Sequence, residues 1–246
     1  GGALSHTPCV DSLALELVAS GWSLKHLVRE IVLTRTFAQS SRYDAAAYQI
    51  DPENRLLWRA HRRRLDAETL RDAMLLAAGT LDLEPMDSTV WYLGDQATAV
   101  GANENRRRTD FPCRSVYLPV IRNDLPELFQ VMNFADPHCT TGRRPQAIAA
   151  TQGLYLLNDP SVMAAADGAA KRLVAEVPAD EQRRIERMFE LLLNATPSDA
   201  ERNAVAGYLR ETEQSQTNAQ AEDPVREAWS LACHALFSSS RFQFLE

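Results

Sequence analysis

The sequence predicts a mainly α-helical fold, and three observations support this prediction. Apolar residues recur every three or four positions in most segments, as they do on the buried face of a helix. Several of these segments start at residues that cap helices and stop at glycine. Runs that suit a β-strand are few and short. The 246 residues, 45% hydrophobic and 24% charged, fit one large core, so we expect a single domain over residues 1–246 with an irregular insertion at about residues 81–113.

The amino-terminal part is expected to open with two helices, at residues 11–20 and 23–37. Gly21 ends the first because glycine adopts a positive φ at low cost, and the Gly21-Trp22 turn is expected to join the two as a hairpin. Residues 51–54 are expected to begin a new structural segment. Asp66 is the expected N-cap of a helix that carries apolar residues at 70, 73, 74 and 77, and Gly79 closes that helix.

Further along the chain, short strands are expected at residues 90–93 and 115–118. Helices are predicted at residues 125–132, 146–157, 161–176 and 180–193. Ser198 and Glu201 fit a capping box at the start of another helix. Residues 214–223 are polar and predict a flexible connection before a last helix at residues 225–237.

Charge and cysteine usage exclude several classes of protein. A formal net charge of −7 argues against nucleic-acid binding, which needs a basic face. No apolar run approaches the roughly 18 residues of a membrane span, and the first residues lack the pattern of a signal peptide. The spacing of Cys9, Cys113, Cys139 and Cys233 contains no Cys-x-x-Cys pair, so neither a zinc ribbon nor a thioredoxin-type site is expected. Two disulfides and buried free thiols remain equally open interpretations.

The strongest candidate binding residues are Arg62, Arg63 and Arg64, which precede a helix carrying Glu68 and Asp72. Guanidinium groups clamp carboxylates or sulfates through two parallel hydrogen bonds, so these arginines could hold an acidic or sulfated group. The alternative is a girdle of salt bridges that fixes the helix against the strand expected at 115–118. We favour the girdle, because every one of these arginines has an acidic residue nearby in the sequence.

A second candidate surface is the turn-rich loop at residues 136–144, which holds Asp136, His138, Arg143 and Arg144. It combines a titratable histidine, the Cys139 thiol and two guanidinium groups, and loops on rigid frames often carry function. A structural loop is the favoured interpretation. Adjacent His138 and Cys139 side chains seldom face each other as base and nucleophile, and the spacing suits no metal.

No recognisable catalytic pattern occurs elsewhere in the sequence. It has no His-x-x-x-His pair, no glycine-rich phosphate loop and no Gly-x-Ser-x-Gly elbow. We therefore expect no cofactor and no metal, name no catalytic residue, and leave open whether the chain is an enzyme.

Several blocks, taken in order, resemble one family over nearly the whole chain. They are GWSLK at 21–25, DPENRLLW at 51–58, RSVYLPVIRN at 114–123, QGLYLLNDP at 152–160 and WSLACHALF at 229–237. These blocks resemble the DUF1553 family, also called PSD1, of planctomycetes and related bacteria. The family offers no catalytic residues to carry over to this chain.

The resemblance implies a cellular location and neighbouring domains. Similar chains sit in larger exported proteins, often beside a DUF1549 domain and sometimes a cytochrome-c-like module, so an extracytoplasmic location is expected from the resemblance alone. Our preferred hypothesis is a non-catalytic helical accessory or interaction domain of such a protein. The alternative is an enzyme or binding domain for a polyanionic, sulfated carbohydrate, recognised through Arg63, Arg64, Arg143 and Arg144.

Overall fold

The computed structural model describes residues 6–85, 111–118, 120–122, 125–142, 144–145, 147–218 and 222–245. The prediction of a mainly α-helical fold is confirmed, because helices dominate these residues and the strands among them are the pair β1 (Arg63–Arg64) and β2 (Phe244–Leu245). The chain forms two compact units, unit 1 (Gly1–Arg63 with Leu245–Glu246) and unit 2 (Arg64–Phe244). The prediction of a single domain over residues 1–246 stays a prediction. The strand expected at 90–93 and most of the expected insertion lie outside the described residues.

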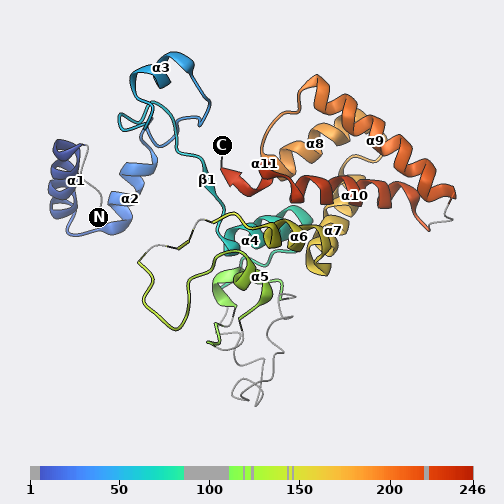
Figure 1. The fold of residues 1–246 in the computed structure, drawn as a ribbon, viewed down its shortest axis with the longest axis horizontal. Helices are drawn as coiled ribbons and strands as arrows, with labels where there is room; N and C mark the ends of the chain where they lie inside the picture. The colour runs from blue at the N-terminus through green and yellow to red at the C-terminus, as the bar shows by residue number, and fades with distance from the viewer. Residues whose placement is uncertain are drawn as a thin grey trace. The chain divides into compact units, whose positions relative to one another are not determined.

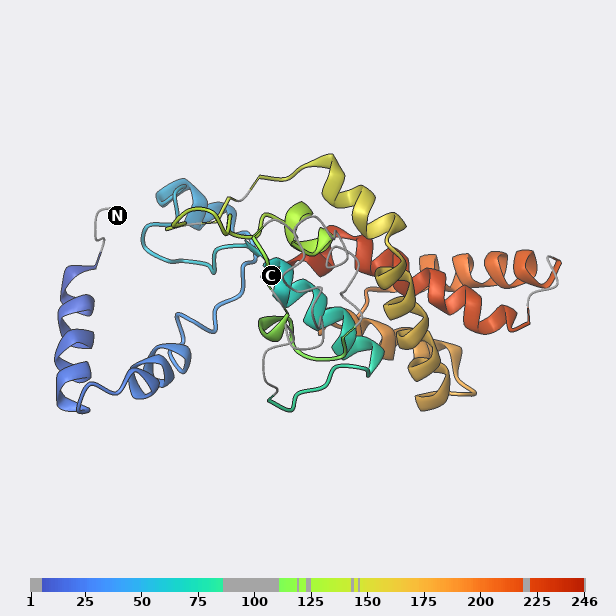
Figure 2. The same ribbon diagram turned by 90° about the horizontal axis from the view of Figure 1, so that it is seen from below.

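Unit 1 contains helices α1 (Thr7–Ala19), α2 (Leu24–Val32) and α3 (Ala45–Ile50). Gly21 ends α1 as predicted: its φ is 69°, its N–H donates to the Val18 carbonyl, and the Trp22 N–H donates to the Leu17 carbonyl. This pair of bonds is the Schellman arrangement that satisfies carbonyls at a helix end. Ser23 then caps α2. In Figure 2 the two helices diverge from this turn at an open angle, so they do not form the expected hairpin of antiparallel helices, and a bond of 2.7 Å between His26 and Glu16 joins them near the turn.

Unit 2 contains the remaining helices. They are α4 (Ala67–Ala78), the 3-10 helix η3 (Ser115–Tyr117), α5 (Glu127–Val131), α6 (Ala150–Asn158), α7 (Pro160–Glu176), α8 (Glu181–Leu193), α9 (Asp199–Asn218), α10 (Pro224–Ser238) and α11 (Ser240–Gln243). Helix α7 lies at the centre of this unit and packs against both α4 and α10.

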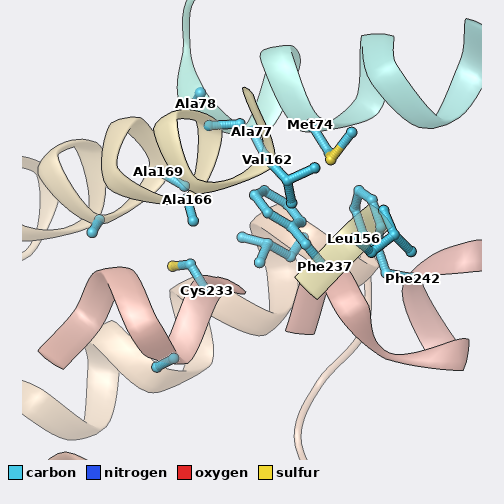
Figure 3. Packing of buried hydrophobic residues seen from close by; sticks show 14 of the residues in the cluster. Met74, Ala77, Ala78, Leu156, Val162, Ala166, Ala169, Cys233, Phe237 and Phe242 are labelled. Atoms are coloured by element: carbon cyan, nitrogen blue, oxygen red, sulfur yellow. The ribbon is translucent and has the colours of Figure 1, made fainter. Parts of the chain in front are cut away.

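Small side chains on α7 allow this close packing. Ala165, Ala166, Ala169 and Ala170 are buried, and Figure 3 shows two of them between α4 and α10. A Cβ atom added at Gly168 would lie 2.9 Å from the Ala78 Cβ, well inside normal contact. Larger side chains complete the core around this seam, among them Leu156, Val162, Trp229, Phe237 and Phe242. Apolar burial of this kind is the main stabilising term of the unit.

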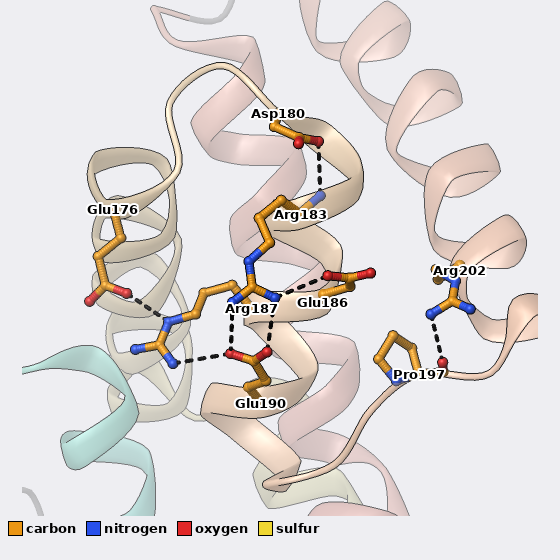
Figure 4. Close-up of polar contacts among 8 residues, drawn as sticks. All are labelled: Glu176, Asp180, Arg183, Glu186, Arg187, Glu190, Pro197 and Arg202. Carbon is orange, nitrogen blue, oxygen red and sulfur yellow. Dashed lines mark hydrogen bonds and ion pairs between the residues drawn. The ribbon is translucent and has the colours of Figure 1, made fainter.

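A network of ion pairs covers the outer face of α7 and α8 (Figure 4). Asp180 caps α8 by accepting the Arg183 N–H at 2.9 Å. Arg187 donates to Glu176 at 2.8 Å, and Arg183 donates to Glu190 at 2.9 Å. Exposed pairs of this kind contribute only about 0–1 kcal/mol each. The network therefore adds little to the stability that the core provides.

Two other local predictions are wrong. Residues 115–118 contain a 3-10 helix rather than a strand, because the Ser115 N–H and hydroxyl both donate to the Asp72 carboxylate and fold the segment onto α4. Residues 214–218 continue α9 rather than forming a flexible connection. Polar residues such as Glu and Gln have good helix propensity, so polarity alone does not end a helix. In the part of the chain that the structure describes, no helix has the length and apolar character needed to cross a membrane.

Candidate functional site

Arg64 is bound within unit 2 rather than open to a ligand. Its guanidinium donates to the Gln243 side chain at 2.7 Å and also to the Gln152 side chain. Gln152 is almost completely buried, and its amide donates in turn to the Val131 carbonyl at 3.0 Å. Burial lowers the pKa of Arg64. Arg64 therefore ties the start of unit 2 to α6 and α11, as a structural role requires.

Arg144 and Glu68 bring the two candidate segments together. Two parallel hydrogen bonds, at 2.7 and 2.8 Å, join the Arg144 guanidinium to the Glu68 carboxylate in the first turn of α4. The same guanidinium lies 4.7 Å from the centroid of the Phe134 ring. Burial is the largest influence on Glu68 and would raise its pKa, but the bonds from Arg144 and from its own backbone N–H outweigh it, so the pKa is lowered. The negative charge of Glu68 neutralises the positive charge of Arg144, so this pair has no net positive charge to attract an anion.

Arg71 and Asp72 join α4 to the segment that contains Cys113 and Ser115. Arg71 is buried and donates to the Cys113 carbonyl at 2.9 Å and to the Ser115 hydroxyl at 3.2 Å. Asp72 accepts the Ser115 N–H at 2.8 Å. These bonds anchor residues 111–115 on α4, although the anchored segment is not the expected strand.

Besides the bonds of Arg144 to Glu68, shorter-range bonds hold the loop at residues 136–144. Asp136 accepts the backbone N–H of His138 at 2.8 Å, and the His138 ring lies 3.1 Å from the Arg122 carbonyl oxygen. Cys139 is an exposed free thiol. Arg143 lies outside the described residues. Neither of two cavities in unit 2, of 510 and 960 Å³, is lined by residues 64–72 or 136–144.

Among the other candidate arginines, Arg63 faces a cavity of unit 1, and Arg62 is absent from the lining of that cavity. Arg59 and His61 line the same cavity, and neither is among the candidate binding residues predicted from the sequence. Residues 59, 61 and 63 alternate in the sequence, but Ala60 also lines the cavity, so alternation alone does not identify its lining.

The exposed apolar side chains of α1 and α2 are the second feature that sequence reasoning missed. No residue of α1 or α2 is buried. We call the set Leu15, Val18, Trp22, Leu24 and Val28 the α1–α2 surface; their exposed fractions run from 54% to 73%. A stripe of apolar residues on a helix predicts burial, but it does not say whether the covering partner belongs to the same chain.

Trp22 is the most unusual member of the α1–α2 surface. Its φ is 64°, in the left-handed region that bulky residues rarely adopt, and its side chain is 70% exposed. The turn therefore holds a large aromatic ring in solvent at a backbone conformation that costs energy.

The four cysteines are free thiols in this structure. Cys113 and Cys233 are buried, whereas Cys9 and Cys139 are exposed. Burial raises the pKa of Cys233 to about 12, and burial is also the main reason that the pKa of Cys113 is raised. Buried thiols with a raised pKa are poor nucleophiles, so these two have the character of core residues. Within the described residues, no cluster of His, Cys, Asp or Glu could hold a metal ion.

Comparison with known proteins gives one match. The model of the PSD1 family, described as a protein of unknown function (DUF1553), matches residues 1–209. The chain belongs to the DUF1553 family. The match covers all of α1 to α8 and about half of α9, so the helix pair lies within the DUF1553 region, as do the lining residues of the unit 1 cavity other than Leu245. No curated protein and no solved structure matches the chain.

Proposed function

We propose that this DUF1553 chain is a non-catalytic helical interaction domain of a larger exported bacterial protein. In this proposal the α1–α2 surface binds another domain of the same protein. The observation that carries the proposal is that α1 and α2 bury none of their residues while exposing large apolar side chains. The extracytoplasmic setting and the neighbouring DUF1549-like or cytochrome-c-like domains come from the family resemblance.

The short lengths of α1 and α2 support the proposal that another domain covers them. Helix α1 has 13 residues and α2 has 9. Isolated helices shorter than about 12–15 residues are marginal in water and depend on packing of an apolar face. Leu24, Val28, Ile31 and Val32 form such a face on α2 and are exposed. Burying one Leu, Ile or Val side chain contributes about 1.5–3 kcal/mol, so covering this face would stabilise both helices.

The arginine clusters give the alternative function less support. Arg64 and Arg144, two of the four residues expected to recognise a sulfated carbohydrate, are bonded within unit 2. Binding of an acidic glycan and any catalytic role stay predictions.

Site-specific photo-cross-linking in the longer exported protein tests the proposal. A photoreactive residue placed at Val28, on the apolar face of α2, should cross-link to peptides of another domain of the same polypeptide. Glu30, on the polar face of the same helix, is the matched control position and should give few such products. Equal products at the two positions, or products at Val28 only between two copies of the DUF1553 domain, would refute this assignment.

A further inference from the structure

Unit 1 contains a cavity that the proposed function does not use. Its volume is 460 Å³, within the range of about 300–1,000 Å³ that is usual for small-molecule sites. The end of α2 and the segment after it form one wall, and the other is formed by Leu57, Arg59, Ala60, His61, Arg63 and Leu245. The side chains that matter for binding are Phe37, Gln39, Leu57, Arg59, His61 and Arg63.

The loop that carries Arg59 is built with buried polar residues. Asp51 is buried, and its carboxylate accepts the N–H groups of Arg55 and Leu56 at 3.0 and 2.7 Å. Asn54 is also buried, and its amide donates to the Arg59 carbonyl at 2.8 Å and accepts the Arg59 N–H at 3.3 Å. Buried polar groups are costly unless they are bonded, so these bonds fix the backbone of Arg59 in place.

Backbone strain lies in the same loop. Asn54 and Leu57 have φ values of 54° and 56°. Asparagine tolerates this region, but a leucine there is strained, and such residues cluster at ligand-binding sites. Leu57 lines the cavity directly. The strained conformation of this wall therefore lowers the stability of unit 1.

The cavity is positively charged. Arg59 and Arg63 line it, and among the described residues no carboxylate belongs to its lining. The Arg59 guanidinium lies 4.8 Å from the centroid of the Trp58 ring and 5.8 Å from that of Tyr43. Stacking on aromatic rings holds a guanidinium in one orientation. Its N–H groups, which lie in the plane of the guanidinium, stay able to bind an anion.

Gln39 supplies an independent indication of a ligand. Its side-chain Oε1 atom is buried, and no donor in the described residues bonds to it. Gln39 also lines the cavity. A buried acceptor without a donor costs about 1–3 kcal/mol, and a ligand hydroxyl would remove that cost once the Gln39 side chain turns to present Oε1 to the cavity.

We propose that this cavity binds a small hydroxylated organic anion. The carboxylate or sulfate group of the ligand accepts hydrogen bonds from Arg59 and Arg63, and the ring of the ligand packs against Phe37 and Leu57. The hydroxyl of the ligand donates to Gln39 Oε1 after that side chain has turned toward the cavity. The proposal concerns a small-molecule site and does not depend on the α1–α2 surface binding another domain. An aromatic acid and a sulfated sugar share this chemistry, and the experiment distinguishes them.

Isothermal titration calorimetry of the full chain at neutral pH tests the site. The probe is para-hydroxybenzoate, with an expected Kd on the order of 1 mM for so small a molecule. Benzoate lacks the hydroxyl donor and phenol lacks the negative charge, so each should bind about tenfold more weakly than para-hydroxybenzoate. Galactose sulfate is the sugar probe: tighter binding than para-hydroxybenzoate would identify a sulfated sugar as the ligand class, and weaker binding would identify an aromatic acid.

Variants assign the binding to the named residues. Arg59→Gln and Arg63→Gln should each weaken the binding of para-hydroxybenzoate about tenfold. Arg62→Gln removes the same charge one residue away and should leave binding unchanged, because Arg62 does not line the cavity. Gln39→Leu should make para-hydroxybenzoate and benzoate bind equally, a change that general damage to the fold would not produce.

Two results would overturn the proposal. One is the absence of measurable binding of every anionic probe to the wild-type chain. The other is an equal loss of binding in Arg62→Gln and Arg63→Gln, which would indicate attraction to surface charge rather than a site. Circular dichroism of each variant confirms that it is folded before its affinity is compared.

Discussion

Gly168 lies where α4 and α7 come closest, and replacing it by alanine tests how tightly unit 2 is packed. The added Cβ would lie 2.9 Å from the Ala78 Cβ and 3.5 Å from the Ala78 Cα and carbonyl oxygen. Carbon atoms in normal contact are about 3.5–4.0 Å apart. The added Cβ points at the Ala78 Cβ, which the α4 backbone holds in place, so only a shift of α4 away from α7 could relieve the clash.

Two opposing effects set the magnitude. Replacing a glycine by alanine inside a helix stabilises the helix by about 1 kcal/mol. Overpacking a core by a methyl group costs about 1–3 kcal/mol. We expect Gly168→Ala to lower the free energy of unfolding by roughly 1 kcal/mol in the wild-type background. In an Ala78→Gly background the clash is absent, so the same substitution should raise the free energy of unfolding by about 1 kcal/mol.

Urea unfolding of the four chains of this double-mutant cycle, followed by circular dichroism, measures the difference. The expected coupling energy between positions 78 and 168 is about 2 kcal/mol. If Gly168→Ala changes stability equally in both backgrounds, the close approach of α4 and α7 is refuted.

Three further predictions follow from the ion pairs, the thiols and the loop of unit 1. Because the pKa of Glu68 is lowered from 4.5 by its bonds to Arg144, the stability from this pair is fully present above that value and is lost as the pH falls through the lowered pKa. Urea unfolding from about pH 5 to about pH 3 should therefore show a smaller loss of stability for Glu68→Gln than for the wild type, and equal losses would contradict the pairing. A chromogenic aromatic disulfide should react rapidly with the two exposed thiols, Cys9 and Cys139, and with the other two only after unfolding; rapid reaction of all four in the native chain would refute the burial. Asn54→Ala should destabilise unit 1 by about 1–3 kcal/mol, because it removes the bonds to the Arg59 backbone; an unchanged tryptophan-fluorescence unfolding curve would argue against that role.

Helix boundaries that depend on local chemistry could be predicted from the sequence. Gly21 and Gly79 both end helices at positive φ. Ser198 and Glu201 form the expected capping box, with the Ser198 hydroxyl accepting the Glu201 N–H at 3.3 Å and the Glu201 carboxylate accepting the Ser198 N–H at 2.8 Å. Each of these signals depends on residues within four positions of each other, so it is complete in the sequence.

Features that depend on distant partners could not be predicted. Residues 115–118 carry strand-forming side chains, but Asp72 decides their conformation from 43 positions away. Arg63 and Arg64 are adjacent and chemically identical, yet one lines a cavity and the other bonds to Gln243, 179 positions away. Arginine-rich sequence indicates a charged surface without indicating which guanidinium groups are already bonded within the chain.

Hydrogen–deuterium exchange of α1 and α2, compared between this chain and the longer exported protein in which we propose that it lies, tests the central claim most directly. In the 246-residue chain the amides of these helices should exchange quickly, because no residue of either helix is buried, whereas the amides of α7 should be protected. In the longer protein the amides of α1 and α2 should become strongly protected while α7 stays the same. Equally rapid exchange of α1 and α2 in both proteins would contradict the claim that another domain covers the α1–α2 surface.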